Sequence, residues 1–149
     1  MFALSVRAPF AALLIYPYDE QRKLYETRGQ WTGQRGLIAI HCSQSYLKRE
    51  QEYAKLVLAP HVPWLDDHID QTPYLGCVIG LAKITDCFPT NRLTLTPYQR
   101  LLGDYSAGRY AWKMEVVEAF AEPIPAKGRL GFWHWKPPPA VEWRHRNGY

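Results

Sequence analysis

Three charged side chains stand close together in an otherwise apolar part of the sequence: Lys23, Glu26 and Arg28. An almost wholly apolar stretch, 8–16, comes before them, and another, 36–40, comes after them. An unpaired charge is costly to bury, so we expect charges between two core-forming segments to pair or to face a cleft. In an extended segment Glu26 and Arg28 point to the same face and can form an ion pair, which Lys23 joins from the preceding turn.

These three groups suit two kinds of chemistry. In recognition, Arg28 and Lys23 bind phosphate oxygens, and Glu26 accepts hydrogen bonds from a base amino group. In catalysis, a partly desolvated Lys23 acts as a base or nucleophile because its charged form is disfavoured, with Glu26 as the acid. Arg28 then stabilises developing negative charge. The third interpretation is an exposed strand whose surface ion pairs have no function.

Other polar and aromatic residues are candidates for contacts with a ligand. Ser5, Arg7 and Lys127 are second contributors to a nucleic-acid-binding site, although placement on the ordinary surface also explains them. Trp31 lies in the loop 29–36 beside the charged segment. There it either stacks on a base or lies on the surface.

Serine and histidine residues in the middle of the chain have alternative explanations as well. Ser43 and Ser45 precede a predicted helix, 46–59, so they either cap it or hold an anion at its start. His41 ends an apolar strand and is expected to be a satisfied core or edge histidine. The sequence contains no nucleophile elbow, P-loop, dinucleotide fingerprint or HExxH motif, and we expect no cofactor and no metal.

The bulk properties indicate one globular domain with an anionic partner. The 149 residues are 47% hydrophobic and 21% charged, which is enough for one well-formed core. Basic residues exceed acidic ones by three in 1–50 and by four in 123–149, and the net charge is +4. Two basic ends favour an anionic partner, and nucleic acid is the first candidate. The aromatic content, 14%, serves a core and base stacking equally well.

Cysteine usage and the apolar N-terminal stretch bear on location. Cys42, Cys77 and Cys87 are odd in number and have no metal-ligand spacing, so we expect reduced thiols in a cytoplasmic protein. The apolar run 8–16 is too short to cross a bilayer, and no cleavage site of the signal-peptide kind follows it. We expect no membrane association.

Hydrophobic periodicity predicts an α+β fold with a strongly curved sheet or partial barrel. Strand-like segments lie at 2–7, 23–28, 37–41, 74–88, 109–121 and 129–135. The two main helices are expected at 9–16 and 46–59, and the first should be buried because it is apolar on nearly all sides. Gly76 and Gly80 indicate bends or a bulge. The segments 60–73 and 89–108 are expected to be loops and turns.

Four short motifs, in order, make the sequence similar to one known family. Residues 21–28 are QRKLYETR, which resembles the GxKxxExR hallmark of the ASCH domain family, relatives of the PUA fold, with Gln21 in place of Gly. Residues 4–10, LSVRAPF, resemble the family's LSxxxPW, and residues 36–43, GLIAIHCS, resemble its RGxLxIHAS. Residues 110–112 and 123–133 resemble its closing strands. The resemblance covers about residues 2–135.

This resemblance implies a PUA-like curved sheet or β-barrel of five to six strands with two main helices, formed by residues 1–135. Residues 136–149 are then a Pro-rich, aromatic and basic tail, expected to be extended and polyproline-like at its prolines. The resemblance also implies a cleft beside the first helix, lined by Lys23, Glu26 and Arg28.

Such domains are thought to act on RNA or nucleotides, so the expected partner is RNA, single-stranded nucleic acid or a nucleotide or nucleoside. The alternatives are a small hydrolase, of the ribonuclease or acetylcytidine amidohydrolase type, and a protein-interaction domain without a nucleic-acid ligand.

Overall fold

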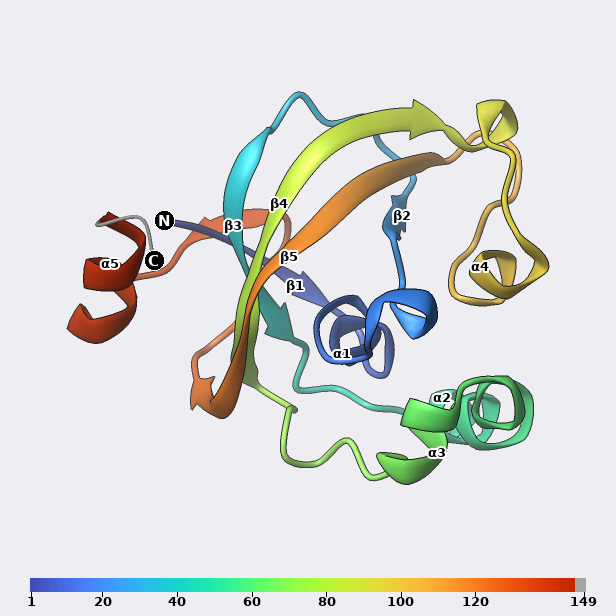
Figure 1. Cartoon of the computed structure of the whole chain (residues 1–149), viewed down its shortest axis with the longest axis horizontal. Coiled ribbons are helices and arrows are strands. Elements are labelled where there is room, and N and C mark those ends of the chain that lie inside the picture. The colour runs from blue at the N-terminus through green and yellow to red at the C-terminus, as the bar shows by residue number, and fades with distance from the viewer. Residues whose placement is uncertain (147–149) are drawn as a thin grey trace.

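The chain folds around one curved sheet, and the computed structural model describes residues 1–146 of it. The strands are β1 Phe2–Val6, β2 Tyr25–Arg28, β3 Gly36–Cys42, β4 Cys77–Pro89, β5 Tyr110–Pro125 and β6 Phe132–His134. Their order across the sheet is β2-β5-β4-β3-β1-β6. β1 and β3 pair in parallel, whereas the other neighbouring strands are antiparallel. The sheet curls into a half-barrel (Figure 1).

The curl arises in the two long central strands, β4 and β5, whose pairing shifts register at three places. One of these lies at Gly80, where a Cβ atom would stand 2.4 Å from the Glu118 carbonyl oxygen and 2.8 Å from the Ile15 side chain. Only glycine permits this close approach of strand, bulge and helix. The predicted bend at Gly80 is therefore confirmed, and it allows the sheet to wrap around the first helix.

Helical segments cover one side of the half-barrel, and the last helix lies at the far end of the sheet (Figure 1). They are α1 Phe10–Ile15, η1 Asp19–Gln21, α2 Lys48–Tyr53, η2 Ala54–Leu58, η3 Ala59–His61, α3 Pro63–Asp67, η4 Thr90–Arg92, α4 Pro97–Leu101 and α5 Pro139–Arg146. The two main helices expected from the sequence are α1 and the stretch that starts with α2 and continues through η2. Within residues 1–146, no helix combines the length and the apolar character needed to cross a bilayer.

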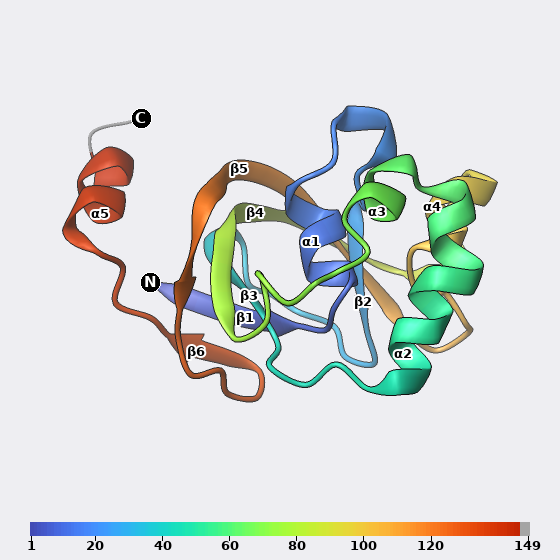
Figure 2. The same ribbon diagram turned by 90° about the horizontal axis from the view of Figure 1, so that it is seen from below.

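The core lies on both sides of α1, as its wholly apolar sequence predicts. Ala11 to Ile15 are all buried. Figure 2 shows α1 enclosed between the curved strands and the α2–α3 layer. Leu13 shares a buried cluster with Leu58 and Leu65 of that layer and with Leu102 after α4. Leu14 and its neighbours pack onto the sheet. The predicted α+β architecture with a curved sheet of five to six strands and two main helices is confirmed.

Two predicted loops contain short helices that the sequence analysis missed. The stretch 60–73 contains α3, which has Pro63 in its first turn, and the stretch 89–108 contains α4, which begins at Pro97. Proline stops a helix, but it also suits the first turn of a new one because that position needs no N–H donor. Thr96 caps α4 by accepting a hydrogen bond from the Gln99 amide at 3.1 Å.

The prediction of an extended C-terminal tail is wrong for most of the described part. After Pro137 and Pro138 the chain forms α5, which lies at the far end of the sheet from α2–α4 (Figure 1). Val141 is buried in a cluster with Trp135, and the Arg144 guanidinium donates to the Glu118 carboxylate at 2.6 Å. Packing against the outer face of the sheet thus selects a helix. Residues 147–149 lie outside the described chain.

Candidate functional site

A cavity of about 950 Å³ lies beside α1, between β1, β2 and the loop that joins β5 to β6. This volume is in the range of small-molecule sites in proteins. Eight of the nine residues proposed from the sequence line it: Ser5, Arg7, Lys23, Glu26, Arg28, Ser43, Ser45 and Lys127. The ninth, Trp31, is 59% exposed in the β2–β3 loop and is not part of the cavity wall.

Lys23 lies in the floor of the cavity, and its side chain is only 1% exposed. Its Nζ atom donates a hydrogen bond to the Leu102 carbonyl oxygen at 2.5 Å. The same atom lies 4.0 Å from Glu26 Oε1 and 5.4 Å from the centre of the Phe10 ring. Burial lowers the pKa of Lys23 to about 8. The Glu26 carboxylate opposes this shift, whereas the positive charge of Arg28 adds to it.

Glu26 and Arg28 pair on one face of β2, as their alternation predicts. Arg28 Nε donates to Glu26 Oε2 at 3.0 Å, and Arg28 Nη2 donates to the Ser5 carbonyl oxygen at 2.8 Å. The Glu26 side chain is 9% exposed and that of Arg28 is 30% exposed. The guanidinium carbon also lies 5.7 Å from the Trp112 ring centre. The pair is therefore a fixed polar element, and the ion pair expected from the sequence is confirmed.

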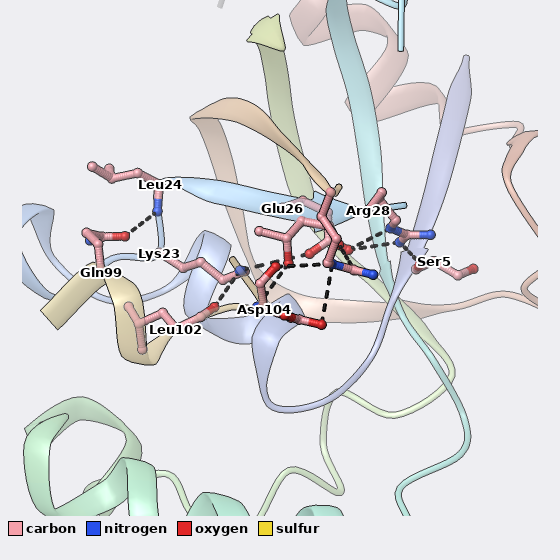
Figure 3. A network of polar contacts seen from close by, with 10 residues as sticks. Ser5, Lys23, Leu24, Glu26, Arg28, Gln99, Leu102 and Asp104 are labelled. Atoms are coloured by element: carbon pink, nitrogen blue, oxygen red, sulfur yellow. Dashed lines mark hydrogen bonds and ion pairs between the residues drawn. The ribbon is translucent and has the colours of Figure 1, made fainter. Parts of the chain in front are cut away.

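Helix α4, which the sequence analysis missed, holds the turn that carries Lys23 (Figure 3). The Gln99 side chain accepts from the Leu24 amide at 3.1 Å and donates to the Arg22 carbonyl at 2.8 Å. These bonds fix the backbone on either side of Lys23. The next residue after α4, Leu102, supplies the carbonyl that holds the ammonium.

The segment after α4 closes the back of the floor. The Asp104 amide donates to Thr27 Oγ1 at 3.2 Å, and Arg109 donates to the Thr27 and Asp104 carbonyls, both at 3.1 Å. At Gly103 an added Cβ would stand 3.0 Å from Lys23 Nζ. Glycine thus lets the backbone lie directly against the ammonium group.

The turn before Lys23 forms without the glycine of the family motif. Gln21 ends the short helical turn η1, and its side chain accepts from the Trp64 amide at 3.0 Å. Its carbonyl accepts from the Tyr98 hydroxyl at 2.8 Å. Within residues 1–146, only glycines have positive φ. A left-handed conformation is therefore not needed at this position.

His41 is a cavity residue that sequence analysis treated as structural. It is 2% exposed, its Nε2 lies 2.7 Å from the Ala126 carbonyl oxygen, and its Nδ1 lies 3.0 Å from Ser5 Oγ. A carbonyl only accepts, so Nε2 carries the proton and the Ser5 hydroxyl donates to Nδ1. Burial lowers the pKa of His41, which favours this neutral form. The Trp133 indole N–H in turn donates to Ser5 Oγ at 3.1 Å.

The prediction that Ser43 and Ser45 cap a helix starting at residue 46 is wrong. The helix α2 begins at Lys48, and the Glu50 carboxylate accepts from the Leu47 amide at 2.9 Å. Both serines instead lie in the preceding loop and line the cavity. The three residues from Ser43 to Ser45 thus form part of the cavity wall, in the loop between β3 and α2.

Arg7 differs from the other predicted cations in its surroundings. Its side chain is 54% exposed and pairs with Glu50 through two hydrogen bonds of 2.6 Å each. The hydrogen bonds to Glu50 raise the pKa of Arg7 further above the physiological range. Within residues 1–146, His, Cys, Asp and Glu side chains form no cluster of three that could hold a metal.

A search against models of protein families and a search of curated proteins gave no match to this chain.

Proposed function

We propose that this protein binds RNA or nucleotide ligands in the described cavity, as a module of the ASCH kind. The observation that carries the proposal is the convergence of Lys23, Glu26 and Arg28 on the floor of one ligand-sized cavity. The resemblance of residues 21–28 to the ASCH motif supports it, as does a curved α+β fold that is compatible with a PUA-like sheet.

The charge of the cavity wall favours an anionic ligand. Five cationic side chains line it, with one carboxylate, Glu26, among them: Arg7, Lys23, Arg28, Lys127 and Arg129. The apolar wall includes Phe10 and Leu130, which suit a base or sugar better than a bare inorganic anion. Single-stranded RNA and nucleotides present this combination of phosphate and unstacked base.

The direct test is binding of short single-stranded RNA and of nucleoside monophosphates to the purified protein at several salt concentrations. We expect binding that weakens as salt rises, because cations of the wall release counterions from the phosphates. Arg28→Ala should weaken binding by tenfold or more, since it removes a floor cation and exposes the Glu26 charge to the ligand. Arg92→Ala removes an exposed cation that is not part of the cavity wall and serves as the matched control.

Two outcomes would contradict the proposal. Equal losses in Arg28→Ala and Arg92→Ala would mean that overall charge, not the cavity, attracts the nucleic acid. Absence of binding to any of these ligands would favour the alternative of a protein-interaction domain, whose charged cavity has only a structural role.

One observation favours a second function, that of a small hydrolase acting on RNA or a modified nucleoside. The pKa of Lys23 is lowered to about 8 by burial, so Lys23 is neutral in roughly a tenth of the molecules at pH 7. A neutral amine can take a proton from an attacking water or hydroxyl group. The Arg28 guanidinium, 2.9 Å from Glu26, would stabilise the developing negative charge.

Hydrolysis is tested by incubating the protein with labelled short RNA and with acetylated cytidine and identifying products by mass spectrometry. We expect turnover that rises with pH and levels off above about pH 8, where Lys23 is mostly neutral. Lys23→Met keeps the volume of the side chain and removes the base, so it should abolish turnover while RNA still binds. If the wild-type protein binds these ligands but forms no product, the hydrolase function is contradicted and only the binding function is retained.

A further inference from the structure

The loop that joins β5 to β6 forms a distinct wall of the cavity, which we call the rim. Six consecutive residues, Ala126 to Gly131, line the cavity. Lys127 and Arg129 are exposed, and Leu130 is 98% exposed although it belongs to the wall. Side chains of the rim thus project at the mouth of the cavity, above the buried floor.

The two rim cations are not neutralised by the protein. Within residues 1–146, neither Lys127 nor Arg129 forms an ion pair or a side-chain hydrogen bond. Each of the other wall cations has a protein acceptor: Arg7 pairs with Glu50, Arg28 pairs with Glu26, and Lys23 bonds to the Leu102 carbonyl. The rim therefore carries the two wall cations that have no protein acceptor within residues 1–146.

The base of the rim is held firmly. The Ala126 carbonyl accepts from His41 at 2.7 Å, and the Ala126 amide donates to the Gly76 carbonyl at 3.0 Å. Gly128 packs against the same histidine: an added Cβ would stand 2.6 Å from His41 Cε1 and 2.8 Å from Ser5 Oγ. His41 and Ser5 thus position the rim over the cavity.

We propose that the rim is the phosphate-binding element of the ligand site, with Lys127 and Arg129 contacting phosphate and the floor contacting the uncharged base or sugar. This proposal rests on the proposed function. At the floor, a phosphate would be buried beside the Glu26 carboxylate, and burial of like charges is unfavourable. At the rim, the phosphate contacts two cations that have no protein acceptor, and it keeps part of its hydration.

The test compares nucleosides with the corresponding 5′-monophosphates, and adds a single-stranded RNA oligomer. The wild-type protein should bind the monophosphates at least tenfold more tightly than the nucleosides. In Lys127→Ala/Arg129→Ala this preference should disappear, while nucleoside affinity stays unchanged. For the oligomer, the slope of log affinity against log salt should become shallower by about 1.4, because each lost phosphate contact contributes about 0.7 for single strands.

A double variant of the same charge change is the matched control. Lys83 and Lys113 are exposed on β4 and β5 and are not part of the cavity wall. Lys83→Ala/Lys113→Ala should retain the preference for monophosphates. An equal loss in both double variants would overturn the proposal, because it would show that only net charge matters.

Gly128→Ala tests the position of the rim separately from its charge. The added methyl group would displace the rim from His41, so the preference for monophosphates should fall although both cations remain. Both cations are exposed, so the double variant decides the question even where Gly128→Ala fails to fold. Equal binding of nucleosides and monophosphates by the wild type would overturn the role of the rim and leave the proposed function intact. Absence of binding to every probe would overturn both.

Discussion

The floor and the rim of the cavity contain the same kinds of side chain in opposite environments. At the floor, Lys23 and Glu26 are buried, and every charge has a partner within 4.0 Å. At the rim, Lys127 and Arg129 are exposed and have no such partner within residues 1–146. A buried charge costs stability unless its partners are complete, whereas an exposed one costs almost nothing.

This difference separates two demands on the sequence. The buried charges of the floor need partners within the folded protein, so their geometry is fixed whether or not a ligand is bound. Residues of the rim are free of that demand, and their charge is available for an external anion. The comparison predicts that substitutions of the floor charges change stability strongly and that substitutions of the two rim cations change binding alone.

The largest effect on stability should follow Glu26→Ala, which leaves the Arg28 guanidinium and the Lys23 ammonium without their carboxylate. Breaking a buried ion pair on one side costs about 3–5 kcal/mol, and we expect a value near the lower end because the Arg28 side chain is 30% exposed. The matched control is Glu142→Ala, which removes the carboxylate from the exposed pair with Arg146 and should cost about 1 kcal/mol or less. Equal urea midpoints for the two variants would contradict the distinction between floor and surface.

The next effect concerns the pH dependence of stability. The pKa of Lys23 is about 8 in the folded protein, below the ordinary value of 10.5. Between these values the unfolded chain binds the proton and the folded protein does not, so this residue makes the protein more stable as pH rises. The gain is on the order of 3 kcal/mol across the whole interval, since a tenfold change in proton affinity corresponds to about 1.4 kcal/mol.

This gain is measured as the difference in free energy of unfolding between the wild type and Lys23→Met at several values between pH 7 and 10. Tyrosines also titrate in this range, but their contribution to the free energy of unfolding is common to both proteins and cancels in the difference. A difference that stays constant over this range would mean that Lys23 is not desolvated in the folded state.

A smaller effect should follow Gly103→Ala behind the floor. The added methyl group would stand 3.0 Å from Lys23 Nζ and 3.1 Å from the Tyr105 ring, both tighter than ordinary contact. Overpacking of this kind costs about 1–3 kcal/mol. Gly29→Ala is the matched control, because nothing lies within 4 Å of its added Cβ. Thermal unfolding of both variants provides the measurement, and equal melting temperatures would contradict tight packing at the floor.

The smallest effect on stability is expected at the rim. Lys127→Ala/Arg129→Ala removes two exposed side chains without partners, so its free energy of unfolding should lie within about 0.5 kcal/mol of the wild-type value. A loss of several kcal/mol would show that the rim cations stabilise the fold, and the contrast with the floor would fail.

Much of the floor could be predicted from the sequence because its signals are local. The two-residue spacing of Glu26 and Arg28 places both on one face of a strand, and the pair forms as expected. His41 could not be assigned in this way. Its partners Ser5 and Ala126 are 36 and 85 positions away, and an apolar strand ending in histidine is equally typical of a core.

The local sequence determined the strand that carries Glu26 and Arg28, the burial of the apolar helix α1 and the bend at Gly80. Each follows from periodicity or from the steric freedom of one residue, and these operate over a few neighbouring positions. The tertiary structure alone decided that the Leu102 carbonyl holds an ammonium group 79 positions earlier, and that the rim lies above the floor. Such contacts depend on how the curved sheet brings distant segments together, and no local pattern contains that information.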